Sequence, residues 1–563
     1  MRKMISGIAL AAVAAVLPAA DGPLVTGEQQ SAAKQITPEL LRAHVRFLAS
    51  DLLEGRGPST RGDRLAEAYI QSRMEALGIQ PGAPGGGWIQ KVPLVGITPS
   101  VPTTVEFRSS KGAPLTVSGV SGAELVAFSG VQKAEARIEN AEVVFVGYGI
   151  VAPEYRWDDY KDVNLAGKVL LMMNNDPEDD PRLFAGKTRL WYGRWDYKYK
   201  MAAKKGAVGA IIIHTTPSAG YGWQVVQSSW SGELFELPED GSPRVQIKAW
   251  ATEDLSRKIV EVGGQNLDLL RASAQARAFR PVPLNVKMSC AITNTIGQKE
   301  SGNVIGVIPG ADPKLSQEAV VYTAHHDHFG IKVGVSASAK ASADEIYNGA
   351  HDNASGVAAI LAVAGAFANL LQPPRRSVYF ALVAGEEQGL LGSEYFAKYP
   401  PVPAGRIASN INIDETGWFG RTRDISMIGL GKSSLDGDVV ALAAMQGRTV
   451  KPDEFPEKGR FYRSDQFNFA KVGVPAAYLK FGTDVIGKPA GYGREQLEAY
   501  EKNDYHQPSD ELKDDWDFSG AVEDARLGFF LGCRVASADA MPQWNKGDEF
   551  EAARKQAIAA LAP

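Results

Sequence analysis

Four of the seven histidines in this chain lie within 27 residues of one another. Together with two adjacent aspartates, the crowded residues are His325, His326, Asp327, His328, His351 and Asp352. Imidazole and carboxylate groups are the ligands that zinc and other borderline divalent ions prefer. The first chemical hypothesis for this chain is therefore a metal site.

Further acidic residues, and one distant histidine, follow strand-like apolar runs. The clusters are Glu386-Glu387 after SVYFALVAG, Asp414-Glu415 after SNINI, and His506 in DYHQPSDE after AAYLKFGTDV. Functional groups collect beyond the carboxyl ends of parallel strands, so these clusters are expected to share one rim. Any one of them alone is typical of a solvated acidic loop. Several together at one rim are costly unless they share a ligand.

Two histidines and three carboxylates are enough to hold two divalent ions, provided that one carboxylate bridges them. Asp352 is the fifth cluster of the set, directly before the apolar stretch GVAAILAVAGAFANLL. The adjacent pair Glu386-Glu387 suggests a division of labour, because neighbouring side chains at a strand end point in different directions. One can bind metal while the other acts as the general base for a bound water.

An α/β fold is predicted for the region that carries these residues. From Asn303, β-branched runs such as NVIGVI and AVVYTA alternate with a long apolar helix. Strands that are apolar on both faces and interleaved with helices indicate a mixed, mostly parallel sheet flanked by helices. Two amphipathic helices are expected earlier, at 37–51 with Thr37 as N-cap, and at 62–79.

Residues 100 to about 290 differ in character, with short β-like runs and a single helix-like unit at 197–210. This region is interpreted as a separate β-rich domain without chemistry of its own. His214 ends a strand there, and His44 on the first helix is expected to be structural.

Composition narrows the function classes. With 563 residues, about two to four structural units are expected. A net charge of −5 offers no basic surface for nucleic acid or anionic lipid. Arg2 and Lys3 before an apolar run predict a signal peptide at residues 1–20. Cys290 and Cys533 are expected to be two buried thiols, with a disulfide as the alternative.

The motifs HHD, NGAHDNASG, GEEQGLLGSEYF, NINIDETG and DYHQPSDE resemble, in order and context, the M28 family of zinc metallopeptidases. The resemblance covers about residues 37–100 and 300–540 and implies the zinc-exopeptidase fold. The middle region resembles an inserted protease-associated domain, through VGYGI, DYKDVNLAGKVLLM and KMAAKKGAVGAIII. The implied domains are a signal peptide (1–20), a leader and N-terminal part (21–118), the insertion (119–284), the catalytic domain (285–545) and a helical tail (546–563).

Carried over by position, the resemblance implies two zinc ions bridged by Asp352. One ion would also bind Glu387 and His506, and the other His325 and Asp414. Glu386 would be the catalytic base. Asp327 would hydrogen-bond the His325 imidazole and fix its orientation.

Some positions depart from the family pattern. His351 replaces a usual acidic residue before the bridging carboxylate, and the loop 334–347 is longer than usual. Ser464 and Asp465 resemble the segment that lines the site, whereas Gln466 stands where a histidine is usual. His326 and His328 match no ligand position and are expected to be solvated, with a place at the entrance of the site as the alternative.

The sequence thus predicts a secreted or periplasmic di-zinc aminopeptidase acting on peptides. Glu415 is a candidate anchor for the substrate amine. A carboxypeptidase of the same family is the nearest alternative, with Arg463 as carboxylate clamp. A single-zinc glutaminyl cyclase, a two-metal phosphoesterase and a non-catalytic receptor-like relative are further alternatives. No nucleic acid partner and no membrane association after signal removal are expected; the oligomeric state stays open.

Overall fold

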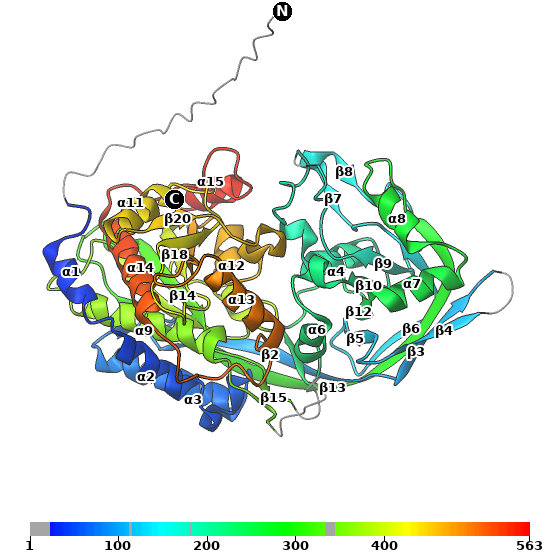
Figure 1. The fold of residues 1–563 in the computed structure, drawn as a ribbon, viewed down its shortest axis with the longest axis horizontal. Helices are drawn as coiled ribbons and strands as arrows, with labels where there is room; N and C mark the ends of the chain where they lie inside the picture. Colours follow the sequence, from blue (N-terminus) through cyan, green and yellow to red (C-terminus); the bar gives the residue numbers. More distant parts are fainter. Residues whose placement is uncertain (1–22, 112–114, 181, 333–343, 563) are drawn as a thin grey trace, which may run out of the picture.

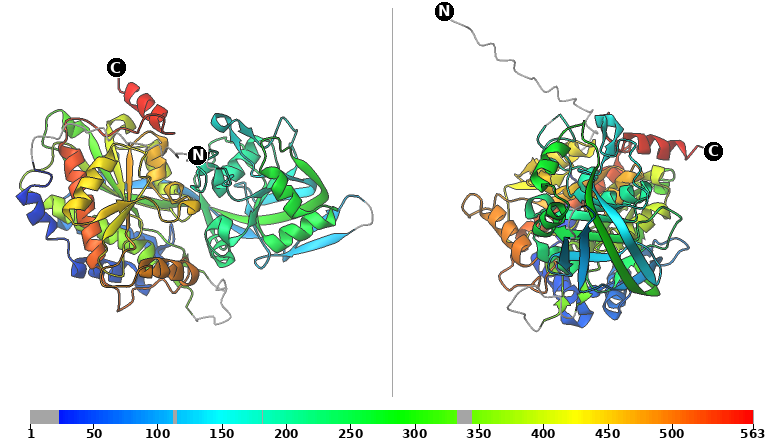
Figure 2. Two further views of the ribbon diagram at one scale, coloured as in Figure 1. Left: turned by 45° about the horizontal axis from the view of Figure 1, so that its top comes forward. Right: turned by 90° about the vertical axis from the view of Figure 1, so that its right-hand side faces the viewer.

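The computed structural model describes residues 23–111, 115–180, 182–332 and 344–562, arranged in two lobes (Figure 1, Figure 2). Strands β2 (Ile89–Ser100) and β13 (Val282–Ile308) pair antiparallel and run from one lobe into the other. They join the two lobes through one continuous sheet. The predicted signal peptide lies outside the described residues.

The first lobe contains a mixed sheet. Its parallel core is β17 (Ser377–Val383), β14 (Ala319–His325), β18 (Ile407–Asn412) and β21 (Ala476–Phe481), in that order. Antiparallel neighbours flank this core: β13 beside β17, and β19 (Asp424–Ile428) beside β21. β20 (Thr449–Lys451) extends β19, and β1 (Gln80–Pro81) pairs with β13. The predicted fold class is confirmed.

Helices cover both faces of this sheet, and β14 shows why its sequence is apolar throughout. Val320 and Tyr322 pack into the core with α9 (Ser355–Ala368), whereas Val321 joins a second core on the opposite face. The helices packed on the α9 side are α1 (Gly27–Ala33), α2 (Pro38–Leu48), α3 (Arg61–Ala76) and α14 (Ser519–Ser537). α11 (Leu435–Met445) packs against α14 in the same core. The other helices of the lobe are α10 (Leu391–Lys398), α12 (Gln466–Lys471), α13 (Tyr492–Asn503) and α15 (Glu551–Ala559). Thr37 caps α2 as predicted, accepting a hydrogen bond from the Leu40 amide.

The second lobe has apolar cores of its own. Its strands are β3 (Thr104–Ser109), β4 (Thr116–Val120), β5 (Leu125–Ser129), β6 (Glu135–Phe145), β9 (Val169–Met173), β10 (Gly209–His214), β11 (Leu234–Glu236) and β12 (Ile247–Thr252). Its helices are α4 (Trp195–Lys204), α5 (Thr216–Ala219), α6 (Trp223–Ser229), α7 (Glu253–Val262) and α8 (Leu267–Ala274). The expectation of a single helical unit is wrong, because short amphipathic segments such as α7 were hidden among the turn residues. The boundaries 119–284 and the protease-associated type stay predictions.

Short hairpin pairs complete the sheet elements: β7 (Val151–Ala152) with β8 (Trp157–Asp158), and β15 (Gly330–Ile331) with β16 (Ile346–Tyr347).

Cys290 and Cys533 are both buried free thiols, so the disulfide alternative is wrong. His44 is structural as expected, with its Nδ1 2.8 Å from the Tyr69 hydroxyl. Among the described helices, none has both the length and the apolar character that crossing a bilayer requires.

Candidate metal centre

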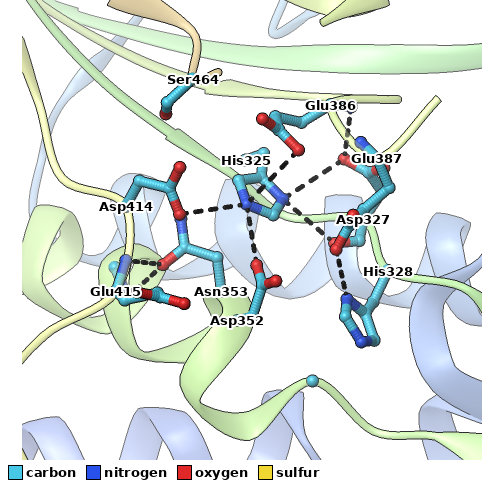
Figure 3. Close-up of polar contacts among 12 residues, drawn as sticks. His325, Asp327, His328, Asp352, Asn353, Glu386, Glu387, Asp414, Glu415 and Ser464 are labelled. Atoms are coloured by element: carbon cyan, nitrogen blue, oxygen red, sulfur yellow. Dashed lines mark hydrogen bonds and ion pairs between the residues drawn. The ribbon is translucent and has the colours of Figure 1, made fainter. Parts of the chain in front are cut away.

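The predicted metal ligands lie together near the carboxyl ends of the parallel strands, and Figure 3 shows four of them, His325, Asp352, Glu387 and Asp414. His325 is the last residue of β14, Glu387 follows β17, and Asp414 follows β18. Asp352 lies in the turn before α9, and His506 follows α13. Strand ends and the termini of two helices together bring side chains into one site that are up to 181 residues apart in sequence.

Asp352 lies between the two imidazoles. The His325 Nε2 atom is 3.2 Å from Asp352 Oδ1 and 3.4 Å from Asp414 Oδ1. On the other side, His506 Nε2 is 3.3 Å from Asp352 Oδ2 and 3.1 Å from Glu387 Oε2. Ligand atoms about 2.0–2.1 Å from a tetrahedral zinc ion lie about 3.3 Å apart. In each group the imidazole nitrogen lies at this spacing from both carboxylates, and Asp352 is common to the two groups.

The side chains of these two groups do not satisfy one another by hydrogen bonding, and their chemistry suits divalent cations. His506 Nε2 is buried and forms no hydrogen bond among the described residues, although two carboxylates lie nearby. The carboxylates of Asp352, Glu387 and Asp414 are nearly inaccessible, and buried charge requires a counter-charge. Burial alone would raise the pKa of Asp352, but His325 and His506 hold it well below its ordinary value. The donor set of imidazole nitrogens and carboxylate oxygens suits zinc.

Glu386 faces the same site without belonging to either group. Its Oε2 atom is 4.0 Å from His325 Nε2, the longest of the imidazole–carboxylate separations in the centre. Burial raises the pKa of Glu386 well above its ordinary value; His325 opposes this, and the negative charge of Asp414 adds to it. A carboxyl group with a raised pKa beside a metal centre can accept and return a proton near neutral pH.

Asp327 contacts both the His325 imidazole and the backbone of Glu386 and Glu387, whereas only the contact with His325 was predicted. The backbone carbonyl of Asp327 lies 3.2 Å from His325 Nδ1, while its carboxylate Oδ1 is 3.7 Å away. The carboxylate instead accepts hydrogen bonds from the backbone amides of Glu386 at 3.1 Å and Glu387 at 3.4 Å. Asp327 therefore positions both the imidazole and the glutamate pair.

The expectation that His326 and His328 are solvated is wrong, because both are fully buried. The 3₁₀ segment Asp51–Arg56 covers them: Arg56 Nε donates to the His326 carbonyl, and the His328 amide donates to the Arg56 carbonyl. His328 Nδ1 lies 2.6 Å from Glu387 Oε1 and so helps to hold that carboxylate.

His351, the main departure from the family pattern, supports Glu415. Its ring is buried against Trp418 and Tyr500, with Nε2 3.0 Å from the Thr416 carbonyl and Nδ1 3.4 Å from Glu415 Oε1. Lys480 also forms an ion pair with Glu415. Burial would raise the pKa of Glu415, but Lys480 and His351 lower it to about 2. Glu415 thus stays ionised at the rim of the site.

Near the strand ends, Ser464 and Gln466 are structural. The Asn412 side chain donates to Ser464 Oγ at 2.8 Å and to Gln466 Oε1 at 2.9 Å. Gln466 also donates to the Phe461 carbonyl at 2.7 Å. Asp465 is buried beside them, and neither of its oxygens has a hydrogen-bond partner among the described residues. Most of the loop 334–347 lies outside the described residues.

The second lobe contributes to the site, which corrects the expectation that it carries no chemistry. One pocket contains the metal centre and is lined by both lobes. Its lining from the second lobe includes Arg189, Trp195, Tyr221, Val225, Ser229 and Trp230. Ser229 Oγ lies 2.9 Å from His506 Nδ1. No local signal revealed this contact, since the two residues are 277 positions apart.

Arg463 also lines this pocket. Its guanidinium donates to the Tyr505 hydroxyl at 3.3 Å and lies 5.2 Å from the centre of the Tyr221 ring. Within the described part of the chain, no carboxylate forms an ion pair with it.

Comparison with known proteins agrees with the predicted resemblance. Residues 303–529 match the family described as Peptidase family M28. An aminopeptidase from Aneurinibacillus sp. strain AM-1 is 20% identical with a TM-score of 0.51, covering 91% of this chain and 97% of that chain. A zinc aminopeptidase from Bacillus subtilis is 17% identical (TM-score 0.46, 89% and 96% covered). A peptidase M28 precursor from Shewanella amazonensis SB2B is 16% identical (TM-score 0.44, 91% and 98% covered).

Proposed function

Since residues 303–529 form a metallopeptidase domain of family M28, we propose that this chain is a di-zinc aminopeptidase that removes N-terminal residues from peptides. The spacing of the metal centre carries the proposal: two groups of ligand atoms 3.1–3.4 Å apart share one bridging carboxylate. The Aneurinibacillus protein, which has the same fold, is named an aminopeptidase.

In this proposal Asp352 would be shared by the two ions, His325 and Asp414 would hold one of them, and Glu387 and His506 would hold the other. Two zinc ions, when bound, would lower the pKa of a water molecule and polarise the scissile carbonyl. Glu386 takes the proton of that water at its carboxylate and passes it to the leaving amine. Asp327 keeps Glu386 in place, because its carboxylate accepts a hydrogen bond from the Glu386 backbone amide.

Glu415 is the proposed anchor for the substrate ammonium group. It lines the pocket and remains ionised, although Lys480 already neutralises much of its charge. The alternative is a carboxypeptidase, and one observation favours it: Arg463 lies in the same pocket without an ion-pair partner among the described residues. That guanidinium suits a substrate carboxylate.

The second lobe is proposed to be a protease-associated insertion that controls substrate access, because it forms one wall of the pocket. Secretion or export to the periplasm is proposed from the apolar run at residues 4–20.

Cleavage of amino-acid p-nitroanilides and of matched peptides with a free or acetylated N-terminus tests the proposal. We expect rapid cleavage of free peptides, loss of cleavage on acetylation, and inhibition by a chelator. Cleavage that survives acetylation but requires a free C-terminus would favour the carboxypeptidase. Chelator-resistant hydrolysis would refute the metal mechanism, and a complete lack of hydrolysis with zinc bound would favour a receptor-like relative.

A further inference from the structure

A second cluster of metal-binding side chains lies beneath the strand end that carries His325. It consists of Asp63 and Glu67, one turn apart on α3, together with His326 after β14. One ligand atom from each residue can be chosen so that all three lie within 4.8 Å of one another. Asp63 and His326 are fully buried, and Glu67 is half-buried. None of the three belongs to the peptidase centre described above.

Two atoms of this cluster face each other without a partner. Both hydrogen bonds to Asp63, from the Ser59 amide and the Ser301 hydroxyl at 2.7 Å each, fall on Oδ2. Asp63 Oδ1 and His326 Nδ1 are buried without hydrogen-bond partners among the described residues. They are 3.6 Å apart, which exceeds the length of an N–H···O hydrogen bond.

The tautomer of His326 follows from its other ring nitrogen. Nε2 lies 3.0 Å from the Gly302 carbonyl, which can only accept, so Nε2 carries the proton. Nδ1 of the neutral ring therefore carries a lone pair, and the nearest carboxylate oxygen, Asp63 Oδ1, lies 3.6 Å from it. Two facing lone pairs in a buried space are stabilised by a cation between them.

The charges of the two carboxylates also favour a bound cation. Like charges four residues apart on a helix repel each other, and burial adds to the cost of ionising Asp63 and Glu67. Burial raises the pKa of each carboxyl group to about 7. Arg64 on the same helix is exposed and opposes this rise only in part. The buried Arg56 directs its guanidinium at the backbone carbonyls of Leu48, His326, Asn348 and Gly349.

Space for the third ligand comes from Gly302. A Cβ atom at this position would lie 3.1 Å from Glu67 Oε1, closer than an ordinary van der Waals contact. The missing side chain thus lets the Glu67 carboxylate lie against β13, beside Asp63 and His326.

We propose that Asp63, Glu67 and His326 bind a third, structural zinc-class ion that ties α3 to the end of β14. One imidazole nitrogen and two carboxylate oxygens form a ligand set typical of zinc. The 3.6 Å separation of Asp63 Oδ1 and His326 Nδ1 is close to the spacing of about 3.3 Å between tetrahedral zinc ligands. The site does not depend on the peptidase proposal.

Metal counting on the full chain tests the site. The protein is stripped with a chelator, reloaded with Zn²⁺ and dialysed, and zinc per chain is measured by mass spectrometry. We expect three equivalents in the wild type and two in Glu67→Gln, with peptidase activity retained. Glu75→Gln is the matched control, because Glu75 lies on the exposed side of the same helix, and it should leave the count at three.

A second background separates this site from the peptidase centre. Asp352→Asn removes the shared ligand of that centre, and we expect about one zinc to remain, which Glu67→Gln then removes. Equal counts with and without Glu67→Gln, or no zinc left in Asp352→Asn, would overturn the third site. If the wild-type protein binds one zinc, and Glu67→Gln removes it whereas Asp352→Asn does not, the di-zinc peptidase proposal is overturned instead. If Glu67→Gln fails to fold, Glu67→Ala and Asp63→Asn replace it, and an Asp352→Asn protein without zinc overturns the third site in any case.

Discussion

Ser229 provides a sharp test of how the two lobes share the metal centre. Its hydroxyl lies 2.9 Å from His506 Nδ1 and reaches that imidazole from the second lobe. A histidine that binds metal through Nε2 carries its proton on Nδ1, so Ser229 is the acceptor that fixes the ring. Loss of such an outer partner typically lowers metal affinity or activity by about 10–100-fold. This corresponds to about 1.4–2.7 kcal/mol.

We therefore expect Ser229→Ala to weaken zinc binding and to reduce kcat/KM within that range. Zinc affinity is measured by competition with a chromogenic chelator, and kcat/KM with an amino-acid p-nitroanilide. Ser231→Ala is the matched control, because its hydroxyl donates to the Ser228 carbonyl in the same segment and bonds no other group of the described chain. Values for Ser229→Ala that match those of Ser231→Ala would refute the idea that the second lobe orients a metal ligand.

Three further predictions follow from individual contacts. Lys332 donates to the carbonyls of Ser228 and Ser231, on either side of Ser229, so Lys332→Met should also weaken zinc binding. Because both variants act on the same segment, their effects on zinc affinity should be non-additive in a double-mutant cycle, and strictly additive effects would contradict this. Glu386→Gln should lower kcat by about 10²–10⁴-fold with an unchanged zinc content, since it removes a proton acceptor and not a ligand; loss of zinc would show that Glu386 is a ligand. Burial, together with Arg73, lowers the pKa of His44 to about 4. The unfolded chain therefore takes up a proton first as pH falls, and stability that is complete above pH 6.5 is lost towards pH 4. The His44 contribution should fall by about 2.5 kcal/mol between pH 7 and 4.5. Urea unfolding of His44→Asn should show a correspondingly smaller pH dependence, and an unchanged one would refute the assignment.

The convergence of three candidate ligands could be predicted from the local sequence. His325 ends one apolar strand, and Glu387 and Asp414 come shortly after two others, so a parallel sheet brings them to one edge. The same logic predicted the mixed sheet itself, whose central strands are apolar on both faces. Asp352 needed the family motif as well, since it precedes a helix instead of following a strand.

Side chains whose role depends on distant partners could not be placed in this way. His326 and His328 look like part of an exposed polar loop until Arg56, some 270 residues earlier, is seen to cover them. His351 looks like a defect in a motif, yet its ring contacts Glu415, which lies 64 positions later. Such contacts arise from tertiary packing, and no periodicity in the local sequence reports them.

The hydrogen bond between His506 and Ser229 changes the expected role of the second lobe. A lid that only excluded water would meet the pocket through its rim and leave the ligands undisturbed. Here the lobe contacts the ring of His506, and the buried Lys332 holds that contact segment from the peptidase side. Separation of the lobes would therefore remove the partner of a proposed metal ligand at the same time as it opened the pocket. Substrate access and the integrity of the metal centre are thus expected to depend on one shared contact.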